Sequence, residues 1–219
     1  MDFSYLMKIA GPMLEGAVTS VGLFFICIVI SLPLGFLFTL MARSRFFPLR
    51  WIANVFIYVM RGTPLLLQLL FIYFGLPVIP GIGQYLRFGR FMAACIGFTL
   101  NYAAYFAEIF RGGLLSIDKG QYEASQVLGL TRMQTTWHII LPQMIRVALP
   151  SLANEAITLV KDTSLLYAVS VPEILHYAQT AVNRDLNILP FVVAAAIYLI
   201  LNGILTLAFK QLEKKFSYQ

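Results

Sequence analysis

Long apolar stretches without charged residues are the main feature of the sequence. Gly16–Ala42 contains 27 residues and Leu186–Phe209 contains 24 residues without Asp, Glu, Lys or Arg, and a helix needs about 20 apolar residues to cross a bilayer. Three further stretches are poor in charge, at Trp51–Leu76, Phe91–Ile109 and Val147–Val160. The pattern predicts five membrane-spanning helices. The fourth is the weakest prediction, because it contains Glu155 and because the uncharged stretch Thr163–Val171 after it could re-enter the membrane.

The composition agrees with a membrane protein. The chain has 219 residues, of which 59% are hydrophobic and 12% charged, and its mean hydropathy is +0.79. A soluble domain of this length could not bury so much apolar surface. The polar connections reach only about 30 residues, too short for a separate folded domain. We therefore expect an all-α integral membrane protein with a single transmembrane domain over residues 1–219.

The positions of the positive charges predict the topology. The net charge is +6, but the basic residues border apolar stretches and form no stripe, so a nucleic-acid partner is not expected. Alternate connections and the C-terminal end hold Arg43, Arg45, Arg50, Arg111, Lys119, Arg132, Arg146, Lys210, Lys214 and Lys215. Cytoplasmic loops carry this excess of Lys and Arg. With five helices, the N-terminus is expected outside and the C-terminus inside the cell.

Residues for catalysis or metal binding are scarce. The sequence has no Gly-Lys pair, so it lacks the phosphate-binding loop of the common ATPases. His138 and His176 are its two histidines and stand 38 positions apart, without the spacing of a zinc site; we expect both in loops or at the interface. Cys27 and Cys95 lie in apolar runs and are expected to pack there. We predict no enzymatic activity, no metal site and no cofactor held by this chain.

The connection at about 115–142 is the most informative polar segment. Asp118 can cap a short helix whose apolar positions Ala124, Val127 and Leu128 are spaced i, i+3, i+4. Gly129 suits the left-handed residue that ends such a helix.

A second helix is expected to follow this turn. Thr131 and Gln134 have the spacing of a capping box, and Pro142 falls near the expected end of this helix. The pattern predicts helix, turn, helix. Such a segment either docks on a cytoplasmic partner or lies on the lipid surface as an interfacial helix.

Several motifs resemble one transporter family. Glu123-Ala124-Ser125, Gly129 and Ile140-Leu141-Pro142 resemble the Glu-Ala-Ala, Gly, Ile-x-Leu-Pro signature of ABC importer permeases, with Ser125 in place of the second Ala. Further segments resemble the polar amino-acid branch of that family, namely Arg61-Gly62-Thr63-Pro64 with Gln68, Asn101 with Ala107-Glu108, Gly120-Gln121 and Lys161-Asp162-Thr163-Ser164-Leu165. The resemblance runs from the first predicted span to the C-terminus.

The resemblance implies a type I ABC importer permease with the MetI-like fold, in a bacterial cytoplasmic (inner) membrane. Its expected partners are two ATPase subunits that bind ATP and Mg²⁺, a second permease subunit that is identical or related, an extracytoplasmic binding protein, membrane lipid and an amino-acid substrate. The first helix of the 115–142 segment would be the coupling helix. The residues expected to couple to the ATPase are Glu123, Ala124, Gly129, Leu141 and Pro142.

Three charged residues fall within or at the ends of predicted spans. They are Arg61, Glu108 and Glu155, and each such charge costs about 2.5 to 3.5 kcal/mol at the centre of a membrane helix. For Arg61 we expect snorkelling to the interface. For Glu108 we expect an ion pair with Arg111, three residues along the helix.

Glu155 has no basic residue within one helical turn, so its partner is expected to be the ammonium group of the substrate. Asn101 is expected to hydrogen-bond the substrate carboxylate or side chain. The resemblance also implies substrate contacts near Asp162, unless this residue pairs with Lys161. Two alternatives remain open from the sequence: a permease for another small polar solute, and a membrane scaffold that holds an ATPase without transport.

Overall fold

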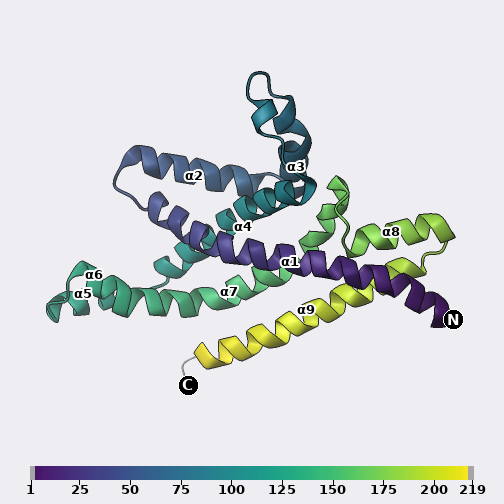
Figure 1. Ribbon diagram of the computed structural model, residues 1–219. Coiled ribbons are helices and arrows are strands. Elements are labelled where there is room, and N and C mark those ends of the chain that lie inside the picture. Colours follow the sequence, from purple (N-terminus) through teal and green to yellow (C-terminus); the bar gives the residue numbers. More distant parts are fainter. Residues whose placement is uncertain (1–2, 217–219) are drawn as a thin grey trace.

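The computed structural model describes residues 3–216, and over these residues the chain is helical and contains no strand (Figure 1). The α-helices are α1 (Phe3–Ala42), α2 (Phe47–Gly62), α3 (Leu65–Leu70), α4 (Arg90–Leu115), α5 (Lys119–Val127), α6 (Arg132–Gln134), α7 (Leu141–Asp162), α8 (Ile174–Asp185) and α9 (Leu189–Phe216). Two π-helical segments lie at Phe71–Gly75 and Thr135–Ile140, and 3₁₀ segments lie at Leu76–Val78, Gly83–Tyr85 and Thr163–Val169.

The membrane-spanning helices agree with the sequence prediction in part. Among the described residues, three helices are long and apolar enough to cross a bilayer, at Ser4–Ala42, Arg90–Leu115 and Leu189–Phe216. They correspond to the first, third and fifth predicted spans. A helix also forms at the fourth, as α7, but it is less apolar and does not meet the same criterion.

The second predicted span is not one straight helix. α2 ends at Gly62, Thr63 and Pro64 are extended, and the chain continues through α3 to Val78 with a bend of 106°. Proline has no N–H and disfavours a helical residue before it, which explains the position of the break. As a result, α3 leaves the bundle sideways (Figure 1).

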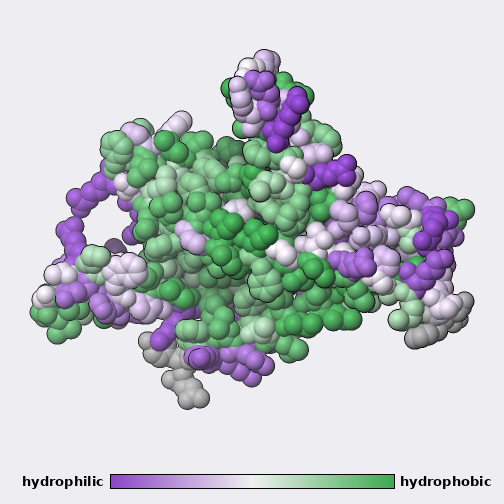
Figure 2. All heavy atoms as spheres, viewed as in Figure 1, coloured by the Kyte–Doolittle hydropathy of each residue, from purple (hydrophilic) through white to green (hydrophobic). Residues whose placement is uncertain are grey.

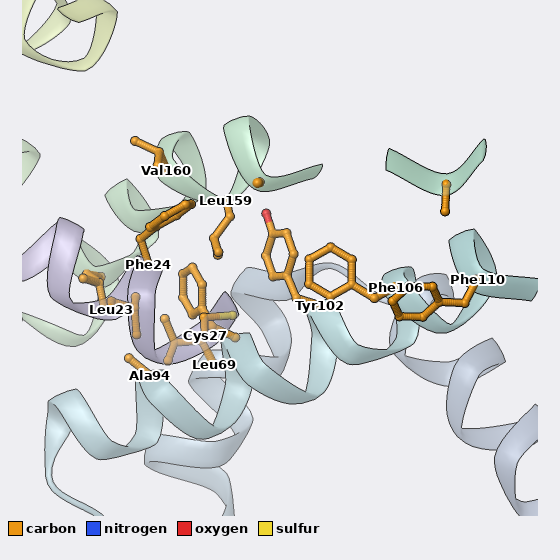
Figure 3. Close-up of a cluster of buried hydrophobic side chains, with 14 of the residues drawn as sticks. Leu23, Phe24, Cys27, Leu69, Ala94, Tyr102, Phe106, Phe110, Leu159 and Val160 are labelled. Atoms are coloured by element: carbon orange, nitrogen blue, oxygen red, sulfur yellow. The ribbon is translucent and has the colours of Figure 1, made fainter. Parts of the chain in front are cut away.

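The bundle is held together around α1 and α4. Leu23, Phe24 and Cys27 of α1 pack against Phe98, Tyr102 and Phe106 of α4 and against Leu159 of α7 (Figure 3). Cys27 is fully buried in this cluster and Cys95 is partly buried beside it, both as free thiols, as predicted. The helices approach closely at Gly35, where a Cβ atom would come within 2.8 Å of the Ala103 carbonyl oxygen.

The outer surface suits a bilayer. Hydrophobic residues cover the middle of the molecule, whereas hydrophilic residues gather at the end that holds α5 and α6 and around α8 at the other end (Figure 2). On α9 only 6% of the most apolar stretch is buried inside the molecule, so the remainder is available to lipid. The two described chain ends lie toward opposite ends of the bundle (Figure 1).

Candidate functional site

α5 begins and ends as its sequence predicts. A side-chain oxygen of Asp118 accepts a hydrogen bond of 2.6 Å from the Gly120 amide and so caps the helix. Gly129 has φ +73°, the left-handed conformation that favours glycine. The Gly129 amide donates to the Gln126 carbonyl and the Leu130 amide donates to the Ser125 carbonyl, both at 3.0 Å. These are the two bonds of a Schellman motif, which stops the helix sharply.

The following helix differs from its prediction at the far end. The capping box of Thr131 and Gln134 is present with both of its hydrogen bonds, as predicted. Pro142, however, does not lie near the end of this helix, because a π-helical segment at Thr135–Ile140 leads directly into α7. A proline ring clashes with the carbonyl group four residues earlier in an α-helix, and the wider π turn relieves this clash. The helix therefore runs on to Asp162.

The apolar positions at the end of α5 are exposed on the surface formed by residues 3–216. Val127 and Leu128 are 87% and 76% exposed, and Glu123, Ala124 and Gly129 are exposed beside them. The other side of α5 is fixed to the bundle by Tyr122, which packs against the main core, and by a 3.1 Å hydrogen bond from Gln143 to Gln121. Of the two predicted coupling residues on α7, Leu141 packs against the core and Pro142 is exposed. One side of α5 thus packs against the bundle, and the other side exposes an apolar edge.

Asn101 holds the break between α2 and α3. It is 4% exposed, and its amide nitrogen donates to the Met60 carbonyl at 3.1 Å and to Gln68 Oε1 at 3.0 Å. Gln68 Nε2 in turn donates to the carbonyls of Met60, at 2.9 Å, and Thr63, at 3.1 Å. Non-helical backbone inside a membrane needs such internal partners. Both amide hydrogens of Asn101 are therefore engaged in shaping the bend.

The charged residues between α2 and α4 form a cluster. Arg111 and Glu108 make the predicted ion pair, with 2.6 Å between Nη2 and Oε2. Arg61 does more than the predicted snorkelling, since its Nη1 lies 3.5 Å from the same Glu108 oxygen and its guanidinium lies 5.5 Å from the centre of the Tyr105 ring. Glu108 therefore holds two arginines at the junction of these helices.

Two carboxylates lie on α7 near this cluster. Glu155 and Asp162 are seven residues apart, which places them on one face about 10 Å from each other along the helix. Asp162 accepts a 2.7 Å hydrogen bond from the hydroxyl of Tyr102, whose ring stands in the core of Figure 3. The ion pairs of residues 3–216 do not include one between Asp162 and Lys161. Glu155 has electrostatic interactions with Asp162 and Arg61 but accepts no hydrogen bond from the described residues.

Glu173 is a buried acidic residue that the sequence analysis did not single out. It is fully buried and caps α8, accepting hydrogen bonds from the amides of Leu175, at 2.8 Å, and His176, at 2.6 Å, and from the Tyr198 hydroxyl, at 2.7 Å. Burial raises the pKa of Glu173, and these hydrogen bonds oppose the rise. His176 consequently lies in the first turn of a helix.

Metal ligands do not gather anywhere in residues 3–216: no group of three His, Cys, Asp or Glu side chains there could hold an ion. Two features of residues 3–216 thus remain as candidate sites. One is the exposed apolar edge of α5, and the other is the set of charged groups around α7.

Comparisons with known proteins agree with these features. Residues 31–218 match the family model of the binding-protein-dependent transport system inner membrane component. The probable amino-acid ABC transporter permease protein YckA of Bacillus subtilis is 42% identical over 84% of this chain and 80% of its own. The arginine transport system permease protein ArtQ of the same organism is 36% identical over 98% and 97%, respectively.

Solved structures show the same architecture. A crystal structure of an amino acid ABC transporter with histidines aligns with a TM-score of 0.88 at 29% identity, over 98% of this chain and 99% of that chain. An inward-facing structure of the MetNI methionine ABC transporter aligns with a TM-score of 0.72 at 20% identity, over the whole of both chains, and shows the shared fold. The chain therefore belongs to the binding-protein-dependent transport system inner membrane components and is the permease subunit of an amino-acid ABC importer.

Proposed function

We propose that this permease carries a polar amino acid whose ammonium group binds to Glu155 on α7, with Asp162 as a second substrate contact on the same face of the helix. The observation that supports the proposal is the Glu155 carboxylate, which is half-buried and accepts no hydrogen bond from residues 3–216. An unpaired charge is costly within a membrane helix. A cationic group of the substrate would offset this cost with charge-assisted hydrogen bonds.

Arg61 adds a positively charged group to the proposed site. Its charge acts on Glu155, and it is held in place by Glu108 and Tyr105. An amino acid has one cationic and one anionic group, so we assign the substrate carboxylate to Arg61, which is suited to bidentate contacts. Asn101 is assigned a narrower role in substrate binding: its N–H groups are engaged, so its carbonyl oxygen can accept from the substrate but cannot donate to a carboxylate.

The cargo is proposed as a class. The names of the relatives mention arginine for ArtQ and L-cystine for TcyB, both of Bacillus subtilis, and putatively glutamine for GlnP of Rickettsia conorii. These compounds share the α-ammonium and α-carboxylate groups that Glu155, Asp162 and Arg61 would recognise. Other side chains, or the binding protein, must distinguish the side chains of these amino acids.

The coupling role is assigned to α5. Its exposed edge at Val127 and Leu128, with Glu123, Ala124 and Gly129, would insert into an ATPase subunit, and Leu141 and Pro142 would transmit the movement into α7. We propose two such ATPase subunits, which bind ATP and Mg²⁺, and a second permease subunit, identical or related. A binding protein would deliver substrate at the end that holds α8. Residues 1–219 would form one permease domain with its N-terminus outside and α5 in the cytoplasm.

The test is substrate-stimulated ATP hydrolysis and uptake by the reconstituted complex with Glu155→Gln. This variant keeps the shape of the side chain but removes its charge, which contributes about 1 to 2 kcal/mol to substrate binding. We therefore expect roughly 5- to 30-fold weaker substrate affinity of the membrane site. Basal hydrolysis should persist. Glu15→Gln, which changes an exposed carboxylate of α1, is the matched control and should behave as the unmodified protein.

A purely structural role for Glu155 predicts a different result. Removal of an unpaired buried charge would then be neutral or stabilising. Unchanged uptake together with equal or higher thermal stability of the detergent-solubilised complex would therefore contradict the proposed substrate site. A scaffold that holds an ATPase without transport would show no substrate-dependent hydrolysis in the unmodified complex.

A further inference from the structure

Arg61 at the end of α2 interacts with two carboxylates on different helices. Its Nη1 lies 3.5 Å from Oε2 of Glu108 on α4, and its charge also acts on Glu155 on α7. The ion pairs within 4.0 Å in residues 3–216 do not include one between Arg61 and Glu155. The guanidinium is therefore held on the side of α4, away from Glu155.

Glu108 is itself fixed by a neighbour on α4. Nε of Arg111 donates to the two Glu108 oxygens at 3.1 and 3.0 Å, and Nη2 donates to Oε2 at 2.6 Å. A guanidinium that contacts a carboxylate through several N–H groups holds it in a defined geometry. Oε2 is also the oxygen that pairs with Arg61, so Arg111 fixes the atom that attracts Arg61.

The flat face of the Arg61 guanidinium also has a partner. Its central carbon lies 5.5 Å from the centre of the Tyr105 ring, and an aromatic ring attracts a cation placed over its face. Tyr105 and Glu108 are three residues apart on α4, which places them on the same side of the helix. Within residues 3–216, Arg61 donates no hydrogen bond, so its N–H groups are available to a ligand.

We propose that Glu108 is a positioning residue that keeps Arg61 apart from Glu155, so that both charges stay available to the two ends of an amino acid. Opposite charges attract strongly where water is scarce, and a pair formed between Arg61 and Glu155 would neutralise both groups. Without the Glu108 charge, Glu155 would be the remaining carboxylate that acts on Arg61. The inference rests on the proposed function, because it takes Glu155 and Arg61 as the groups that bind the substrate.

This role has a consequence for ligands that lack a carboxylate. If Arg61 moved onto Glu155, it would occupy the group that binds the substrate ammonium. The α-amide of an amino acid keeps the ammonium group and has an uncharged carboxamide in place of the carboxylate. Loss of Glu108 should therefore weaken the binding of the α-amide as well. If Glu108 only oriented Arg61 toward the substrate carboxylate, binding of the α-amide would not change.

The experiment measures ligand binding to the detergent-solubilised membrane complex with its ATPase subunits, in the absence of the binding protein. The probes are the amino acid that binds most tightly among the twenty standard amino acids and L-cystine, and the α-amide of that amino acid. Both are measured at about pH 6, below the usual pKa of an α-amino group. The variants are Glu108→Gln, Arg61→Gln and the two together. Glu15→Gln, which changes an exposed carboxylate of α1, is the matched control.

We expect Glu108→Gln to weaken the binding of both probes about tenfold, the size of effect seen between groups of one ion-pair network. In the Arg61→Gln background, the same change should not alter binding of the α-amide, because no guanidinium remains to approach Glu155. Glu15→Gln should bind both probes normally. Thermal unfolding midpoints show whether each variant is folded. If Glu108→Gln is not, Tyr105→Leu takes its place, since it frees the Arg61 guanidinium without a change of charge and should weaken binding of the α-amide about threefold.

Unchanged binding of the α-amide by the folded variant would overturn the proposal, and so would a loss of equal size in the Arg61→Gln background. Tighter binding of the amino acid by Glu108→Gln would also overturn it, because Glu108 would then compete with the substrate carboxylate for Arg61. Failure of the proposed function gives a different result, since Glu155→Gln would then bind both probes as the unmodified complex does. If Glu155→Gln weakens binding and Glu108→Gln does not, this inference alone fails.

Discussion

Polar side chains inside this helical bundle serve two different purposes. Asn101 and Gln68 satisfy the backbone where α2 and α3 separate, so that their amide N–H groups are used by the chain itself. Glu155 is half-buried on α7 and accepts no hydrogen bond from the residues that the structure describes. A pattern of polar residues in apolar stretches cannot separate these two cases, because the difference lies in contacts between segments 30 or more positions apart.

Asn101→Ala tests the first purpose. The change leaves Gln68 Oε1 without its Asn101 donor and removes one of the two donors to the Met60 carbonyl, so we expect the complex to lose about 1 to 3 kcal/mol of stability. The measurement is the thermal unfolding midpoint in detergent. Asn154→Ala, which changes an exposed amide on α7, is the control and should shift the midpoint little. Equal midpoints for both variants would show that Asn101 does not hold the bend.

Asp185 allows a test by pH. Its carboxylate accepts hydrogen bonds from Arg184 and from Tyr5 near the start of α1, and chiefly the Arg184 bond lowers its pKa from 3.8 to about 2. A pKa lowered by folding means that the ionised form stabilises the protein above the ordinary pKa, and that this contribution disappears as the pH falls toward the folded value.

The difference in unfolding midpoint between the unmodified protein and Asp185→Asn should accordingly be constant above about pH 4 and shrink toward zero near pH 2. The effect is expected to be small, because this ion pair is exposed to solvent. A difference that stays constant down to about pH 2 would contradict the assignment.

At the scale of elements, local signals in the sequence predicted local structure well. Asp118, Gly129 and the Thr131–Gln134 pair each act within a few residues, and the ends of α5 and the start of the next helix follow them. The 106° bend after Gly62 was not predicted. Pro64 marks where a helix is weak, but the direction of the bend is set by Asn101 from another helix.

The sequence pattern also did not predict that the helix before Pro142 continues directly into α7. Pro142 looked like an end signal, and its effect is absorbed by the π-helical segment before it. The candidate site shows the same limit. Glu155 could be chosen by its charge and Asp162 through the family resemblance, whereas the contacts of Arg61 to Glu108 and Tyr105 depend on packing of α2 against α4.

The turn after α5 gives a prediction at this scale. Gly129 has φ +73° and open space around it, so Gly129→Ala strains the backbone by about 1 to 2 kcal/mol without a steric clash. Gly129→Val should be more damaging and should abolish transport, whereas Gly129→Asn should retain part of it, since Asn tolerates this conformation. Binding of substrate to the binding protein should not change.

Gly112→Ala is the matched control for this series, because Gly112 lies within α4 with open space around its Cα atom and a helical backbone. Alanine there should maintain transport and add a little stability. Normal uptake by Gly129→Val at normal expression would show that the geometry of this turn is not needed for coupling.

Viewed as a whole molecule, the structure connects the two proposed sites through one helix. The chain runs from the capping box at Thr131 through the π-helical segment and α7 to Asp162. The proposed coupling residues Leu141 and Pro142 stand at the start of α7, and the proposed substrate residues Glu155 and Asp162 lie in its second half. A rigid helix of this kind can pass a displacement of α5 to the substrate site if ATP-bound and ATP-free states hold it differently.

The orientation of the molecule in the membrane is the remaining whole-molecule prediction. Gln126 on α5 and Asn183 on α8 are both exposed and belong to opposite ends of the bundle (Figure 1). The basic residues near α5 predict that this end faces the cytoplasm. In a background without Cys27 and Cys95, a membrane-impermeant thiol reagent should label Asn183→Cys in intact cells, and Gln126→Cys only after the membrane is opened.

Each variant controls for the other, because both cysteines stand on exposed helical positions and should react equally once the membrane is permeable. Uptake assays of both variants confirm that the labelled protein is assembled. Labelling of both positions from the same side would rule out opposite ends for α5 and α8. Labelling with the sides exchanged would place α5 outside the cell, where no ATPase could reach it, and would overturn the proposed coupling role.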